Sequence, residues 1–395
     1  MGERCFETTR ISRREPYRPA AWRGVQFQIS FEAKFSPVDA DILNMNKTII
    51  SMNKDKSLIF LPISLLIFFQ VIIVNRINAY DPPSGAEELF SFGHPGFITS
   101  AQSSAGNVLF LPSVHAAAIN PSLVAELQRL SVDLGYTALV ETKDGAGLGN
   151  AFYAGMLFPT RFGVFSGATQ GLFSSINNMD FGNVLIARSG FARDVTERLN
   201  VGAGLFGGGV FGGAFNDWAL ALDVGFMYKL GKLGFLKDAR YGVALSNMGK
   251  TFVHGSDIFP AIFTFKAGFA ANFLNKDKIT AGFSADLSFP LFQNVIFNTG
   301  LQFLIANMIV VSAGWDVNVR EAARGDGIHL PFLGIGVRFT VGNFMNRQAW
   351  EGSDFMISGA WRQIHDGIQL ISTGASLNLG VRDSEPPIIT IEEGE

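Results

Sequence analysis

Strict alternation of apolar and polar residues is the feature that most constrains this chain. Between Ile279 and Phe289 every second residue is apolar, and the residues between them are Thr, Gly, Ser, Asp and Ser. Because successive side chains of a β-strand point to opposite faces, a period of two predicts a strand with one apolar and one polar face. The same alternation recurs along most of the chain from Leu130 to Val381. Many such strands in series predict an all-β protein, a transmembrane antiparallel β-barrel.

We expect about fourteen strands, an even number as a closed bacterial barrel requires, each of roughly nine to fifteen residues. Clusters of Gly, Asn, Asp and Lys that interrupt the alternation set their limits. The expected ranges are 130–141, 150–158, 161–172, 180–193, 198–211, 217–230, 239–248, 260–273, 278–289, 294–304, 308–319, 328–341, 354–364 and 368–381. Residues 130–382 therefore form the predicted transmembrane domain.

The alternation also assigns a face to each side chain. The residues expected to face lipid include Phe263, Phe265, Phe269, Trp218, Leu220, Leu222, Val224 and Phe226. The charged residues expected to face the lumen are Lys266, Asp223, Asp286, Asp316 and Arg338. Short joints between strands are expected at the periplasmic end and longer loops at the outer end.

Residues 52–79 have the pattern of a secretory signal peptide. A basic start at Met52 is followed by the apolar run 57–74 and by small residues that end at Ala79, where we expect cleavage. An uncleaved transmembrane anchor is the alternative, because about eighteen apolar residues reach the lower limit for spanning a bilayer. Residues 1–51 have no period of either kind and precede a complete signal peptide. We expect them to be a non-native or disordered extension.

Composition excludes several classes of function. Residues 1–79 carry 11 basic and 7 acidic side chains, so their removal changes the formal charge from −3 to about −7. With no basic stripe, nucleic acid is not an expected partner. Cys5 lies in the expected extension, and the five histidines are scattered, so neither a disulfide nor a metal site is predicted.

No sequence motif supports catalysis or a cofactor. Gly202–Gly207 matches the dinucleotide-binding GxGxxG pattern, with Asp223 about twenty residues further on, but no helix is expected after it. Its glycines fit a strand in which small residues relieve crowding inside a plugged barrel. No sequence resembles a nucleophile elbow. We therefore expect no enzyme, no catalytic residue and no cofactor.

The segment 80–129 differs from the barrel strands, since it is rich in Gly, Ser and Pro and alternates poorly. We expect it to form a hatch or plug. Pro121 forces Asn120 out of the helical region and can begin a short helix, expected at 121–130. At the other end, residues 383–395 form an acidic tail.

The stretch Ala116–Ser122 (AAAINPS), which leads into the strand Leu130–Tyr136 (LSVDLGY), resembles the FadL-like long-chain fatty acid transporters of the outer membrane. The residues of this stretch are most similar to those of the treponemal FadL-like branch, with the PorV-like proteins as more distant relatives. The resemblance covers about residues 84–382 and implies a fourteen-stranded barrel with an N-terminal hatch that carries an Asn-Pro-Ala motif. Here the motif is Asn120, Pro121 and Ser122, with Ser in place of the usual Ala. The acidic tail, in place of a terminal aromatic residue, is a second departure.

The resemblance implies a channel for uptake of long-chain fatty acids or similar hydrophobic small molecules across the bacterial outer membrane. A lumen cation, Lys266 or Arg338, would hold the carboxylate, while membrane lipid surrounds the barrel. Either cation could instead be paired with Asp223, Asp286 or Asp316, and Asn120-Pro121 could be a turn without a gating role. The alternative function is a PorV-like anchor or shuttle for other proteins, in which the acidic tail would contact a periplasmic protein partner.

Overall fold

The computed structural model describes residues 80, 82, 85, 87, 90–99, 103–106, 113–141, 147–174, 182–212, 216–254, 257–258, 261–276, 278–325, 330–340, 352–364 and 368–380. The expected N-terminal extension, signal peptide and acidic tail lie outside the described residues. No helix within the described ranges is long and apolar enough to cross a membrane.

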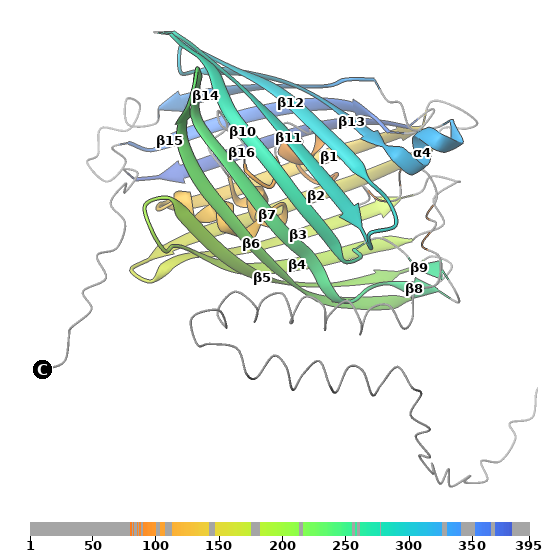
Figure 1. Cartoon of the computed structure of the whole chain (residues 1–395). Coiled ribbons are helices and arrows are strands. Elements are labelled where there is room, and N and C mark those ends of the chain that lie inside the picture. Colours follow the sequence, from red (N-terminus) through yellow and green to blue (C-terminus); the bar gives the residue numbers. More distant parts are fainter. Residues whose placement is uncertain are drawn as a thin grey trace, which may run out of the picture. The chain divides into compact units, whose positions relative to one another are not determined.

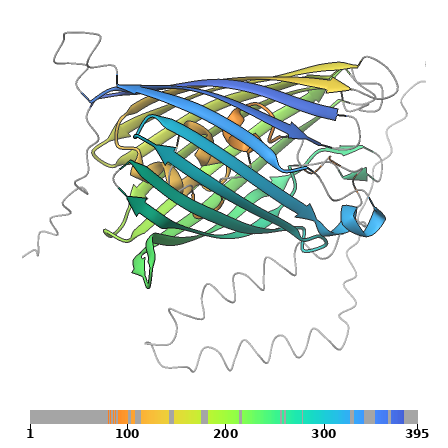
Figure 2. The same ribbon diagram turned by 90° about the horizontal axis from the view of Figure 1, so that it is seen from above.

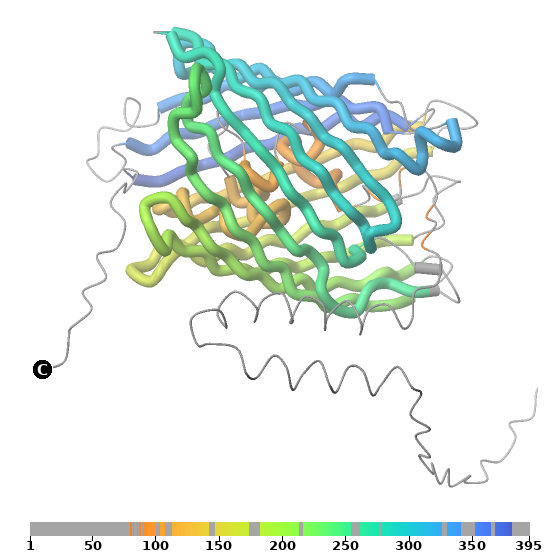
Figure 3. Tube along the Cα trace, in the orientation of Figure 1, coloured from red at the N-terminus to blue at the C-terminus, as the bar shows by residue number. Residues whose placement is uncertain are grey.

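Fourteen antiparallel strands close into one barrel (Figure 1; Figure 3). They are β1 (Leu130–Glu141), β2 (Leu148–Thr160), β3 (Gly163–Ser174), β4 (Asn183–Asp194), β5 (Leu199–Phe211), β6 (Asp217–Leu233), β7 (Leu236–Lys250), β10 (Thr264–Lys276), β11 (Ile279–Pro290), β12 (Ile296–Ile305), β13 (Ile309–Asn318), β14 (Phe332–Thr340), β15 (Asp354–Gln363) and β16 (Ile368–Leu379). Each strand pairs with the next of these in the chain, and β1 pairs with β16 to close the barrel. The predicted fold class is confirmed.

Each expected strand corresponds to an observed one, and only the limits differ. The largest shift at a strand start is in β10 and β14, each of which begins four residues later than predicted. The two-residue strands β8 (Val253–His254) and β9 (Asp257–Ile258), which pair with each other, were not predicted.

The outer and inner faces of the wall alternate as expected. In β6, Trp218, Leu220 and Phe226 are 57%, 52% and 47% exposed, whereas Asp223 in the same strand is 4% exposed. Asp286 and Asp316 are likewise buried inside the barrel. An apolar outer surface of this extent is unfavourable in water and favourable in lipid. The exterior is therefore that of a transmembrane barrel.

The two ends of the barrel carry connections of different length. At one end the strands are joined by short turns, with the exception of the longer connection from β14 to β15 (residues 341–353). An example is the turn between β12 and β13, where Ala306 and Asn307 have φ of 52° and 56°. Two consecutive positive φ angles are typical of the tightest hairpin turns. The other end carries the longer connections, including β8, β9 and the helix α4 (Val319–Arg324). We call these the short-turn end and the loop end.

Three short helices lie in the interior of the barrel (Figure 2, orange). They are α3 (Pro95–Ile98) and the 3-10 helices η2 (Val114–Ala118) and η3 (Pro121–Glu126). The described residues from Tyr80 to Arg129, which we call the internal segment, contact β1 to β6 on one side and β15 and β16 on another. The helix expected at 121–130 begins at Pro121 as predicted but ends at Glu126 and has 3-10 geometry.

Candidate functional site

Asn120 of the hatch motif joins parts of the chain that are distant in sequence. It is fully buried, and its Nδ2 donates to the carbonyl oxygens of Ser104 (2.6 Å) and of Phe226 in β6 (3.1 Å). Its Oδ1 accepts from the backbone N–H (3.0 Å) and the hydroxyl (2.7 Å) of Ser122, so that Asn120 caps η3. The hydroxyl of Ser122 thus makes a hydrogen bond that the usual Ala could not make. The motif connects two stretches of the internal segment to the wall.

Glycines on the inner wall make this approach possible. A Cβ at Gly225 would collide with Asn120 Oδ1, one at Gly202 with the backbone of Pro121, and one at Gly242 with the carbonyl of Ser104. The three glycines belong to the neighbouring strands β5, β6 and β7. The internal segment therefore contacts the backbone of three adjacent strands directly, with no wall side chain between them. Gly202, which belongs to the match with the dinucleotide-binding pattern, is therefore a packing residue of the inner wall, where the sequence led us to expect small residues.

A second contact, which we call the seam joint, consists of His94, His115, Ser113, Asp133 and Ser376. His115 Nδ1 and His94 Nε2 each lie 3.0 Å from the carboxylate of Asp133, and their rings stack with centroids 4.3 Å apart. The hydroxyls of Ser113 and Ser376 each donate to the same carboxylate over 2.6 Å. The His94 N–H is poorly aligned with its acceptor, so that contact is mainly electrostatic. Asp133 and both histidines are buried.

The hydrogen bonds of His94 argue against a metal ion at this joint, although the three donor side chains lie within 4.8 Å of one another. His94 Nδ1 accepts the N–H of Gly96 (3.0 Å), so a neutral ring carries its proton on Nε2, the nitrogen that faces Asp133. A metal at Nε2 would displace that proton, and a neutral ring would then carry it on Nδ1, where it would face the N–H of Gly96. The cluster is therefore a hydrogen-bonded joint, which no local signal in the sequence indicated.

The seam joint lies where the barrel closes. Asp133 in β1 is directly opposite Ser376 in β16, and the next inward-facing pair is Gly135 with Gly374. A Cβ at Gly135 would collide with the backbone of the internal segment next to His94. The segment is thus fastened to both strands of the closing pair. Burial, and after it the neighbouring His94, lowers the pKa of His115 in η2.

A third contact, the loop-end joint, ties the beginning of the internal segment to α4 and nearby strand ends; it consists of Tyr80, Glu87, Asn294, Asn318 and Arg320. Arg320 donates to the carbonyl of Tyr80 (2.6 Å) and to Glu87 (3.2 Å) and lies over the Tyr80 ring. Asn294 and Asn318 each donate to Glu87 Oε2 over 2.6 Å. Burial raises the pKa of Glu87 despite these donors.

Between the internal segment and the wall lies a cavity of about 190 Å³. Its wall side is polar, with side chains from β7, β10, β11 and β12, and its opposite side includes Phe90, Phe97 and Ile119 of the internal segment. Three cations, Arg188, Lys266 and Arg362, also line it, as do the acids Glu87 and Asp286. The cavity therefore offers both an apolar surface and positive charge.

Lys266 differs from the other two cations. Arg188 forms an ion pair with Asp223 (2.9 Å) and Arg362 forms one with Asp316 (3.0 Å). Within the described part of the chain, Lys266 makes neither a hydrogen bond nor an ion pair within 4.0 Å. The nearest acid is Asp286, whose carboxylate accepts the N–H of Ser104 (3.1 Å) and faces its hydroxyl.

The structure places Arg338, the second predicted cation, elsewhere. Its side chain lies on the lumen face of β14 near the short-turn end. It forms an ion pair with Asp354 (3.2 Å), which also binds Arg129 (2.6 Å). It does not line the cavity of Lys266. Its partner Asp354 is not among the three aspartates that the sequence pattern offered for pairing.

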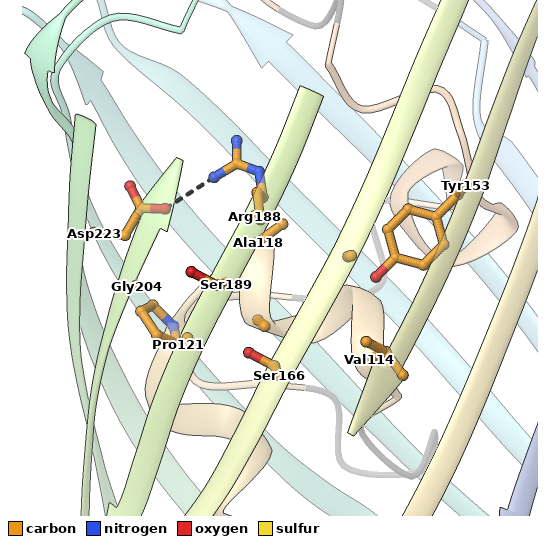
Figure 4. A pocket seen from close by; sticks show the side chains of 12 residues that line it. Val114, Ala118, Pro121, Tyr153, Ser166, Arg188, Ser189, Gly204 and Asp223 are labelled. Atoms are coloured by element: carbon orange, nitrogen blue, oxygen red, sulfur yellow. Dashed lines mark hydrogen bonds and ion pairs between the residues drawn. The ribbon is translucent and has the colours of Figure 1, made fainter. Parts of the chain in front are cut away.

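A smaller cavity of about 20 Å³ lies beside η2 and η3 (Figure 4). The hydroxyl of Tyr153 points toward it and has no hydrogen-bond partner among the described residues, while Arg188 and Asp223 form their ion pair at its edge. Ser189, Gly190 and Gly204 line it, so little side-chain volume separates it from the outer surface of the wall.

The fold and this interior define a class, a transmembrane β-barrel whose lumen is occupied by its own N-terminal segment. No family model matches the sequence, and no curated protein does. The chain is similar in fold to several solved structures, one of which is described as a FadL homologue.

Three of these similar structures illustrate the comparison. They are the Ralstonia pickettii toluene transporter TbuX (11% identity, 74% of this chain and 99% of that chain, TM-score 0.45), the CymD monoaromatic hydrocarbon channel (12%, 76% and 100%, 0.45) and a Pseudomonas aeruginosa FadL homologue (11%, 76% and 98%, 0.41).

Proposed function

We propose that this chain is an outer-membrane channel for the uptake of hydrophobic molecules that carry an acid group, with long-chain fatty acids as the first candidates. The observation that carries the proposal is the unpaired Lys266, among the described residues, in an interior cavity that also has apolar walls. Lys266 is half-buried, and a cation held away from bulk water without a hydrogen-bond partner is unfavourable, so an anionic ligand would relieve that cost.

The physical chemistry of an acyl chain suits this interior. Burial of each CH₂ group contributes about 0.8 kcal/mol, so the tail supplies most of the affinity on surfaces such as Phe90 and Phe97. The carboxylate would accept a charge-assisted hydrogen bond from Lys266, which orients the ligand. The role expected of a lumen cation is thus proposed for Lys266 and not for Arg338.

Passage through the barrel requires a change in the internal segment, because that segment fills the lumen. We propose that the hatch motif of Asn120, Pro121 and Ser122 holds the segment in the closed state through its contacts to β6 and to Ser104. A ligand could leave past a displaced segment or sideways beside Gly190 and Gly204, where the wall is thin.

Binding of a fluorescent long-chain fatty acid to the full-length protein in detergent tests the proposal. We expect saturable binding that unlabelled acids displace, and about 10-fold to 100-fold weaker binding in Lys266→Met, because a charge-assisted hydrogen bond is lost. Lys276→Met is the matched control, since Lys276 is an exposed residue of the same strand. If the folded barrel shows no displaceable binding, the anchoring role, with a periplasmic protein partner, becomes the better proposal.

A further inference from the structure

The polar residues that line the Lys266 cavity indicate that its ligand has a second polar group besides the acid group. Seven polar or charged residues from the neighbouring strands β7, β10, β11 and β12 face the cavity: Ser246, Asn247, Thr264, Lys266, Asp286, Ser288 and Asn298. The strand register places them side by side, since Thr264 is opposite Ser246 and Lys266 is opposite Ser288. Thr264 donates to the carbonyl of Ile262 (3.0 Å) and Ser288 bonds to Asp286, but a bare hydrocarbon would offer no partner to the polar groups that still lack one, which is costly in a buried site.

Asn247 is the most specific of these groups. Its Nδ2 donates to the carbonyl of Ile262 (3.2 Å), but its Oδ1 is buried and has no hydrogen-bond partner in the described ranges. The residue sits at an irregularity in the pairing of β6 with β7, with φ of 58°, and its N–H donates to Asp223 (2.7 Å). A bulge of this kind commonly redirects a side chain toward a site. A hydrogen-bond donor on a ligand in this cavity would satisfy the buried oxygen.

The separation of Asn247 from Lys266 limits where the donor can be. Lys266 pairs with Ala244, three residues before Asn247 on β7. Three residues of a strand span roughly 10 Å, of which the lysine side chain covers a part. The span therefore favours a donor several carbons along the chain over one next to the carboxylate.

We infer that the cavity selects acids that carry a hydroxyl group several carbons from the carboxylate, in preference to plain fatty acids or hydrocarbons. The carboxylate binds Lys266, the hydroxyl donates to Asn247 Oδ1, and the hydrocarbon portion packs on Phe90, Phe97 and Ile119. This inference rests on the proposed function and names the substrate class of the same site.

Competition with a fluorescent fatty acid tests the inference in the full-length protein. The competitors are decanoic acid and its monohydroxy derivatives substituted at carbon 3, 6 or 10. We expect the carbon-6 or carbon-10 derivative to bind roughly 3-fold to 10-fold more tightly than decanoic acid, as one net hydrogen bond allows. The carbon-3 derivative should show no such gain.

Asn247→Gly provides the matched variant, because glycine accepts the positive φ without strain and removes the acceptor. The ratio of hydroxylated to plain acid affinity should fall to about one. Asn307→Gly is the control, since Asn307 also has positive φ but is exposed in a turn at the short-turn end, and it should keep the ratio.

Each outcome has a distinct meaning. Equal binding of plain and hydroxylated acids overturns the inference and leaves the proposed function intact. A hydroxyl preference that survives in Asn247→Gly overturns the assignment to that residue. Failure of every acid to bind the folded barrel removes the proposed function, and the inference with it.

Discussion

The seam joint and the loop-end joint fasten the same internal segment in different ways. At the seam, short side chains converge on Asp133, whose side chain is fully buried, and glycines let the backbones touch. At the loop end, the long side chains of Arg320 and Glu87 span the gap; Glu87 is 4% exposed and Arg320 is 15% exposed. Fully buried and closely packed contacts resist local opening, whereas a contact that depends on a long, partly solvated side chain such as Arg320 gives way first. The comparison indicates that the segment detaches at the loop end while the seam holds.

Removal of the Asp133 carboxylate should have the largest effect. In Asp133→Ala, Ser113, Ser376 and the two histidines lose their common acceptor inside the barrel. We expect a loss of about 3 to 5 kcal/mol in the free energy of unfolding, measured in urea. Glu197→Ala, which removes an exposed carboxylate in a turn, is the control and should cost less than about 1 kcal/mol. Similar losses in both variants would mean that the seam is not the firm joint.

A methyl group on the glycine row should have the next largest effect. Gly225→Ala places a Cβ against Asn120 Oδ1, and overpacking of this kind costs about 1 to 3 kcal/mol. Gly207→Ala in β5 is the control, because its nearest neighbour, a carbon of Leu220, is 3.8 Å away. Urea unfolding of both variants makes the measurement. Equal stability would show that the motif does not depend on this close approach.

Arg320→Met should loosen the loop-end joint alone. The variant loses the hydrogen bonds to Tyr80 and Glu87 and the contact with the Tyr80 ring. We expect about 10-fold faster amide hydrogen exchange in residues 80–90, because roughly one net charged hydrogen bond is lost, and unchanged exchange in residues 94–99. Faster exchange across both regions would show that the two joints open together.

Acidification should act on the two joints with opposite signs. The pKa of His115 is lowered in the folded protein, so its contribution is complete above the unfolded value of about 6.5 and is lost as the pH falls below it. The pKa of Glu87 is raised, so its contribution is complete below the unfolded value of about 4.3 and is lost as the pH rises through the folded value. Hydrogen exchange corrected for intrinsic rates should therefore show, from about pH 7.5 to about pH 5, weaker protection at residues 113–120 and stronger protection at 85–90. A change of the same sign at both would contradict this assignment.

The wall could be predicted because its signal is local. The alternation that places Trp218 outside and Asp223 inside spans only a few residues, and the strand limits follow from nearby turn residues. The placement of Lys266 on the inner face followed from the same period. The lack of a partner for Lys266 among the described residues could not be predicted from that period, because it depends on the hydrogen bond between Asp286 and Ser104 of the internal segment.

The joints could not be predicted, since each assembles residues from distant parts of the chain. His94 and His115 have no sequence spacing that brings their rings together, and Ser376 reaches Asp133 only because the barrel closes. Arg338 had a predicted role as a ligand cation, but its partner Asp354 comes from the neighbouring strand β15.

The sequence by itself determined that this chain forms a barrel of fourteen strands with an apolar exterior, because a period of two is a property of neighbouring residues and their solvent. Only the tertiary structure decided which lumen charges are neutralised, where a buried acceptor is left without a donor among the described residues, and how the internal segment is held. Those properties depend on distances between strands and segments that meet only after the barrel has closed around its N-terminal residues.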